Sequence, residues 1–113
     1  MTDLLAGHVE INLDGSTVTL VPSLGCAMIL CKKHGGFTPL FERLANLDLQ
    51  AAVDVVFHGM GVPESERETI AGHVFATGLM ELMPRLSAFV FALASGGKPV
   101  PSDDEEDAGA PFQ

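Results

Sequence analysis

Two cysteines and a histidine lie close together in the chain and could contribute ligands to a metal ion. Cys31 and His34 are three residues apart, so they would share one face of a helix, whereas Cys26 would point elsewhere. A tetrahedral zinc site would need a further ligand from His58 or His73, and the chain has no paired C-x-x-C spacing. We therefore interpret these residues as buried thiols and a helix-end histidine, and we expect no metal and no other cofactor.

A second pair of residues could support acid–base chemistry. Asp54 and His58 are four residues apart, so on one helix they could hydrogen-bond to each other. Catalysis would also require a nucleophile or a substrate pocket beside them, and the sequence indicates neither. The chain contains no phosphate-binding G-x-x-x-x-G-K-[ST] loop, dinucleotide-binding fingerprint or nucleophile elbow. We predict that the protein is not an enzyme. A small enzyme or a metal sensor is a further option, and metal analysis of the purified protein would reveal the sensor.

The composition limits the remaining classes of function. The chain has 113 residues, enough for one domain, and 47% of them are hydrophobic. Its net charge is −9, of which residues 103–107 supply five negative charges. Such a surface repels phosphate and no basic patch is visible, so we expect no binding to nucleic acid.

The cysteine spacing and the N-terminal residues bear on the location of the protein. On one helix, Cys26 and Cys31 would have Cα atoms about 8 Å apart and side chains about 140° apart, which is unsuitable for a disulfide. The first residues, "MTDLLAGHVE", contain neither a basic region nor a long apolar run, so they do not resemble a secretory signal. We therefore expect a reducing, cytoplasmic environment.

The N-terminal part of the body is predicted to be a β-hairpin. Apolar and polar residues alternate over 8–13 and 16–21, and the Asp14-Gly15 pair between them is a strong two-residue turn signal. A lone hairpin is marginally stable in water, so its apolar face must rest on other elements.

Helical patterns fill the remainder of the body. Caps are expected at Ser23, Thr38 and Asp48, with Pro39 in the first helical position after Thr38. The predicted helices cover 24–34, 39–46, 49–59, 63 to about 77, and 79–95. The expected fold class is α+β and mainly helical: an N-terminal hairpin packed on a bundle of four to five short helices. Residues 1–97 form the single domain (hairpin 8–21, helices 23–95), and 98–113 form a disordered acidic tail.

The last predicted helix is apolar on more faces than a small domain can cover. One stripe reads as core and contains Leu79, Leu82, Met83, Leu86, Phe89, Val90 and Leu93. Met80 and Phe91 lie outside that stripe, with Ala88 and Ala92 further round. Either the hairpin or a second copy of the chain covers these residues, or they form a surface for another protein.

A membrane-spanning role does not fit the same helix. Its uncharged run, 86–94, is less than half of the roughly 20 residues that a span requires. Pro84 either starts a regular stretch of this helix or kinks it.

Several segments together resemble one known family. They are "GHVEINLDGSTVTLVPS" at the start, "HGGF" after the first predicted helix, "ATGLMELMPRL" at the last helix junction, and "LASGG" at its end. This order is similar to that of phage tail assembly chaperones of the gene-transfer-agent type, also labelled as a tail tube protein family. The resemblance covers about residues 7–97. It departs in the first helix, where "AMILCKK" is more apolar than in typical members.

The resemblance implies a non-enzymatic assembly factor in the cytoplasm of a bacterial host that carries a prophage or gene transfer agent. Such chaperones coat the tape-measure protein, help to recruit tail tube subunits, and are absent from the finished particle. The expected partner-binding residues are Phe75, Met80, Met83 and Phe91. The alternative is a structural tail component, such as a tube or connector subunit, although tube subunits are mainly β.

Overall fold

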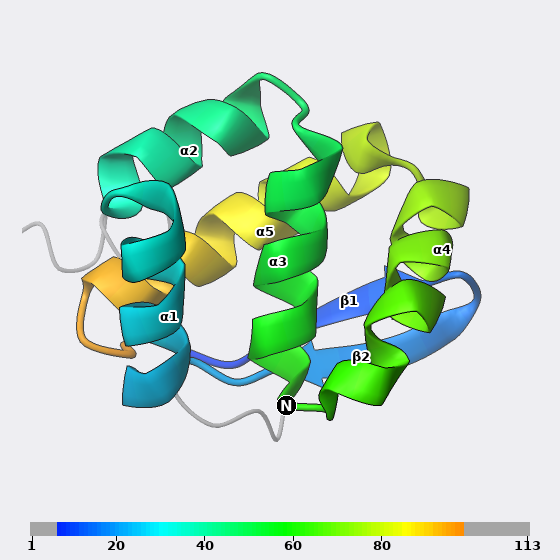
Figure 1. Cartoon of the computed structure of the whole chain (residues 1–113), viewed down its shortest axis with the longest axis horizontal. Coiled ribbons are helices and arrows are strands. Elements are labelled where there is room, and N and C mark those ends of the chain that lie inside the picture. Colours follow the sequence, from blue (N-terminus) through cyan, green and yellow to red (C-terminus); the bar gives the residue numbers. More distant parts are fainter. Residues whose placement is uncertain (1–6, 99–113) are drawn as a thin grey trace, which may run out of the picture.

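The structure, a computed structural model, describes residues 7–98, and within them a hairpin is followed by a set of short helices (Figure 1). The elements are β1 (Val9–Leu13), β2 (Ser16–Leu20), α1 (Leu24–His34), α2 (Phe37–Ala45), α3 (Leu49–Met60), the 3-10 turn η1 (Glu64–Glu66), α4 (Arg67–Thr77) and α5 (Leu79–Ala94). The predicted α+β, mainly helical fold is therefore confirmed. The predicted acidic tail lies outside the described residues from position 99 onward.

The hairpin forms through the predicted turn. β1 and β2 pair antiparallel, with Val9 opposite Leu20 and Leu13 opposite Ser16. Asp14 and Gly15 both have positive φ, 53° and 88°, as a two-residue hairpin turn requires. The backbone N–H of Asp14 donates to the Thr77 hydroxyl at 2.6 Å, which ties the tip of the hairpin to the end of α4.

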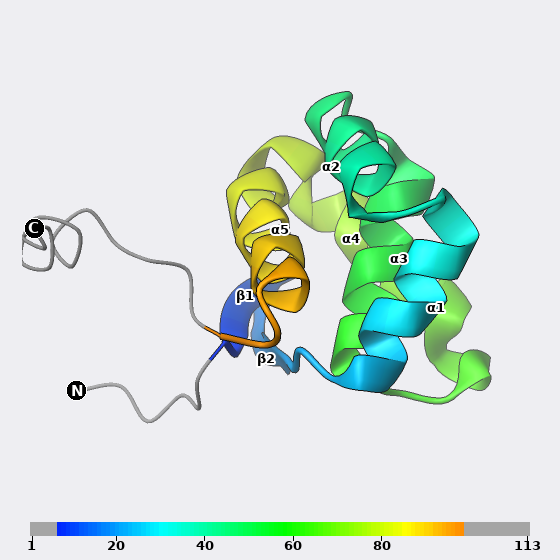
Figure 2. The same cartoon turned by 90° about the vertical axis from the view of Figure 1, so that its left-hand side faces the viewer.

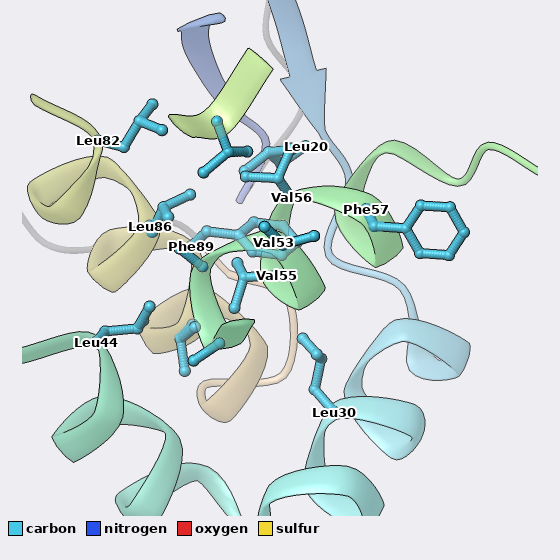
Figure 3. Packing of buried hydrophobic residues seen from close by; sticks show 14 of the residues in the cluster. Leu20, Leu30, Leu44, Val53, Val55, Val56, Phe57, Leu82, Leu86 and Phe89 are labelled. Atoms are coloured by element: carbon cyan, nitrogen blue, oxygen red, sulfur yellow. The ribbon is translucent and has the colours of Figure 1, made fainter. Parts of the chain in front are cut away.

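Helix α3 is the centre of the core. Residues 51–57 are all buried, because α1, α2, α4, α5 and β2 surround this helix (Figure 1). Figure 3 shows Val55 and Val56 of α3 beside Phe89 of α5 and Leu20 of β2. At Gly59 a methyl group would lie 3.1 Å from Leu20 and 3.2 Å from Phe89, so the glycine permits this close approach.

Two of the three predicted helix caps are present. The Ser23 hydroxyl accepts from the Cys26 N–H at 3.1 Å, and the Asp48 carboxylate accepts from the Ala51 N–H at 3.2 Å. Both side chains therefore satisfy backbone donors that have no partner inside their own helices.

The prediction of Thr38 as a cap was wrong, because α2 already begins at Phe37 and Gly36 occupies the cap position. The N–H groups of Gly35 and Gly36 both donate to the carbonyl of Cys31, which ends α1 and turns the chain early. Pro39 still lies in the first turn of α2, where its missing N–H costs nothing.

Helices α4 and α5 meet at a sharp corner. Gly78 separates them with φ 99°, and the two axes differ by 116°. Pro84 lies inside α5 rather than at its start, so the carbonyl of Met80 lacks its usual helical donor. Among residues 7–98, no single helix has the length and apolar character needed to cross a membrane. Within this range, only the segments Glu64–Thr77 and Leu79–Ala94, which are bent by 116° at this corner, reach that length and composition when they are combined.

The two ends of the described chain lie side by side (Figure 2). A methyl group at Gly7 would collide with the backbone carbonyl of Gly97, so the two glycines are in close contact. The N–H of Gly97 donates to the carbonyl of Ala92 at 2.7 Å and folds the chain back over the end of α5. Gly97 is thus part of the packed body.

Candidate partner-binding surface

Met80 and Phe91 lie on one exposed face of α5. Their exposed fractions are 74% and 45%. They are eleven residues apart in the helix, so their side chains point within about 20° of the same direction and lie about 16 Å apart along the helix axis. Met83, Pro84 and Ser87 lie within about 60° of this direction, and none of the five side chains is charged. We call Met80, Met83, Pro84, Ser87 and Phe91 the α5 face.

The borders of the α5 face are formed by other elements. On one side Arg85 donates to the backbone carbonyl of Glu10 at 2.8 Å, so the hairpin closes that flank. On the other side a narrow, shallow crevice lies between α5 and the loop that joins α2 to α3. Its lining is almost entirely apolar and consists of Leu44, Leu47, Asp48, Ala52, Leu79, Met83 and Leu86.

Met83 and Leu47 connect the α5 face to this crevice. Met83 is half-buried and belongs to both, which fits its two predicted roles as core residue and as contact residue. Leu47 is 40% exposed and has a φ of 60°, a strained position for a branched side chain. Sequence reasoning missed Leu47; a leucine between Asn46 and Asp48, outside any helical pattern, was the available signal.

The structure does not bring Phe75 onto the same face. Phe75 is 72% exposed, but it belongs to α4, whose axis is turned 116° from that of α5. The residues of α4 that enter the core are Ile70 and Val74. Phe75 is therefore a separate exposed apolar residue near the corner between the two helices.

The expectation for Ala92 was wrong. It was placed on the uncovered side of the last helix, yet it is fully buried. Around α5 it lies within about 20° of Arg85, on the flank that faces the hairpin. Covering by a non-helical segment leaves no periodic trace in the sequence.

A second exposed apolar surface lies on α1 and was not predicted. Leu24 is 76% exposed and Met28 is 64% exposed, with Ile29 beside them. Only Cys26, Leu30 and His34 of this helix are buried. We call Leu24, Met28 and Ile29 the α1 face. Its sequence signal was the run "LGCAMILC", which is apolar all round although one side of the helix faces solvent.

The predicted Asp54–His58 pair is replaced by a different buried cluster. Asp54 is buried and accepts hydrogen bonds from Arg67 at 2.9 Å, from Lys33 at 3.1 Å and from the His34 ring at 3.0 Å. Instead of contacting Asp54, the His58 ring packs edge-on against Phe57 with ring centroids 5.0 Å apart. The cluster joins α1, α3 and α4.

The charges in this cluster favour a structural role. Burial alone would raise the pKa of Asp54, but the hydrogen bonds and charges of Arg67 and Lys33 outweigh it and hold that pKa below its ordinary value. Burial lowers the pKa of His58, and the charge of Lys33 adds to the effect. Asp54 therefore stays ionised and fully engaged, which suits a lock between helices better than a general base.

The cysteines and histidines show no assembled metal centre. Within residues 7–98, no group of three His, Cys, Asp or Glu side chains is placed to hold a metal ion. Cys26 and Cys31 are both free thiols. Burial raises the pKa of Cys26 to about 12, so this thiol is not activated for nucleophilic chemistry.

The described residues thus present two exposed apolar surfaces and one buried polar cluster. No protein-family model, curated protein or solved structure matches this chain. Of these features, the α5 face contains three of the four residues that the sequence singled out for partner contact.

Proposed function

We propose that this protein is a tail assembly chaperone of the phage or gene-transfer-agent type. In this role it shields apolar stretches of the tape-measure protein in the bacterial cytoplasm and aids assembly of the tail tube. The observation that supports the proposal most is the uncharged α5 face, on which Met80 and Phe91 remain exposed.

The shape of this surface suits a helical client. About 16 Å of exposed face corresponds to about three turns of an apposed helix, whose apolar residues would recur on one side. The two methionines provide flexible side chains that adapt to different client sequences. Each contact of this size is weak, but many copies along one long client gain affinity through avidity.

The charge of the protein also fits a coating role. A net charge of −9 makes copies repel one another in solution, while apolar contact with the client does not depend on charge. The proposal therefore explains why exposed apolar residues and a strongly acidic composition occur together.

Co-expression with the neighbouring tape-measure gene tests the proposal. The wild-type protein should keep the client soluble, and the double variant Met80→Ser with Phe91→Ser should lose this effect. Because neither residue is part of the buried core, the variant should retain its helical circular dichroism and lose at most about 2 kcal/mol of stability. The control variant Leu24→Ser with Met28→Ser removes equally exposed apolar groups from α1 and should still protect the client.

Two results would contradict the proposal. Client solubility that is independent of this protein would remove the chaperone role. A stoichiometric amount of the protein in purified particles, measured by mass spectrometry, would instead favour the alternative of a structural tail component.

A further inference from the structure

We propose that the acidic segment after residue 98 docks on the α1 face of its own chain. Residues 99–101 would pass over Leu24 and Met28, and the acids at 103–107 would pair with Lys32. The inference does not depend on the chaperone proposal, because it concerns a different helix.

The exposed side of α1 has an apolar part and a basic end. A single row along α1 is formed by residues four positions apart: Leu24, Met28 and Lys32. Each side chain in this row is rotated by about 40° around the helix axis from the one before it. The sequence of α1, "LGCAMILCKKH", contains no acidic residue. A segment that crosses this row from its start would therefore meet apolar side chains first and a cation afterwards.

Lys32 is a cation without an acidic partner in the part of the chain that the structure describes. Apart from Lys98, at the start of the acidic segment, the other lysines and arginines there are engaged: Lys33 and Arg67 with Asp54, Arg43 with Asp48, and Arg85 with the carbonyl of Glu10. By contrast, no carboxylate within residues 7–98 pairs with Lys32. In a chain with a net charge of −9, an exposed unpaired lysine beside an apolar row marks a place that an acidic segment can complement.

The chain leaves the described body next to the start of this row. A hollow of about 370 Å³ is lined on one side by Gly96 and Gly97 and on the other by residues at the start of α1, including Leu24. Figure 1 shows the turn after α5 beside the first turn of α1. The acidic segment therefore begins where the row begins.

The length of the segment matches the length of the row. Five residues separate Lys98 from Asp103 and span up to about 17 Å when extended. Eight residues of helix separate Leu24 from Lys32 and rise about 12 Å. The first acids can therefore reach Lys32 while Pro99, Val100 and Pro101 lie over the apolar part of the row.

The segment of the same chain fits this surface better than a second copy of the protein. Two copies that each carry −9 repel one another, whereas the attached segment is present at an effective concentration of about millimolar. Its charge is also opposite to that of Lys32. The chain's own acidic segment is therefore the partner that we assign to the α1 face.

Zero-length carbodiimide cross-linking of the full chain, followed by peptide mass spectrometry, tests the contact. The chain contains three lysines, Lys32, Lys33 and Lys98, so products are easily assigned. The Asp54 carboxylate, whose side chain is 3% exposed, is shielded from the reagent, so circular dichroism is recorded alongside to report an intact fold. We expect links from Lys32 to residues 103–107 within single chains, with a yield that does not change on dilution.

Variants separate true docking from mere attachment. Leu24→Ser with Met28→Ser should reduce the Lys32 links by at least about fivefold relative to the wild-type chain, because the apolar contacts are lost. The matched control, Phe75→Ser with Met80→Ser, removes equally exposed groups elsewhere and should leave the yield unchanged. The inference is overturned if Lys32 links are absent, if they occur only between chains, or if they persist undiminished in the α1 variant.

Discussion

Replacing Asp54 by Asn should destabilise the fold by about 3 kcal/mol. The Asp54 side chain is 3% exposed, and the substitution removes its charge while keeping its size. Breaking a buried ion pair by removing one partner costs about 3–5 kcal/mol. Lys33, at 41% exposed, is well solvated and contributes less than about 1 kcal/mol, so most of the loss comes from Arg67 and His34.

Equilibrium unfolding in urea measures this loss. For a domain of this size an m-value of about 1 to 1.5 kcal/mol/M is expected, so the midpoint should fall by about 2–3 M with an unchanged slope. Asp14→Asn is the matched control, since Asp14 pairs with His73 at 2.9 Å but both side chains are exposed. The control should lose less than about 1 kcal/mol. A loss below 1 kcal/mol for Asp54→Asn would refute the view that this cluster locks three helices together.

Further predictions concern pH, packing and capping. The pKa of His58 and that of Asp54 lie below their ordinary values of 6.5 and 3.8, so the folded state binds fewer protons than the unfolded state. Stability should therefore fall as the pH drops below about 6.5 and again below about 3.8, and His58→Gln should flatten the first step in urea titrations across pH. Gly59→Ala should lower the thermal midpoint because its methyl group crowds the core. Gly72→Ala, in open space on α4, should raise the thermal midpoint, because it increases the free energy of unfolding by about 0.5–1 kcal/mol. Ser23→Ala should cost about 1 kcal/mol in urea unfolding, since the Cys26 N–H loses its acceptor; an unchanged midpoint would contradict this capping role.

The elements of the fold were predictable wherever neighbouring residues determine them. The Asp14-Gly15 turn and the caps at Ser23 and Asp48 act within a few residues, and the structure contains all three. Thr38 failed for a related reason: the two glycines before it complete the turn alone, so the helix starts before the threonine can cap it.

The candidate surfaces were only partly predictable, because exposure depends on what other segments cover. The periodicity of α5 correctly left Met80 and Phe91 outside the core. The same method could not show that Ala92 is buried, nor which side of the uniformly apolar α1 meets the body.

The partners of Asp54 were also beyond sequence reasoning. They come from 20 or 21 residues earlier in the chain and from 13 residues later. The i, i+4 spacing within one helix suggests only His58 as a partner for Asp54. Which charged side chain reaches the carboxylate is instead decided by how the helices pack. Long-range charge clusters of this kind require the fold itself.

The contact between Gly7 and Gly97 has a consequence for protein engineering. Since Gly7 and Gly97 touch, a short linker could join the two ends of the body, and new termini could be opened in the exposed loop at Gly61. Such a circular permutant should retain the fold, and its chain ends would lie at the end of α3 instead of at the end of α5.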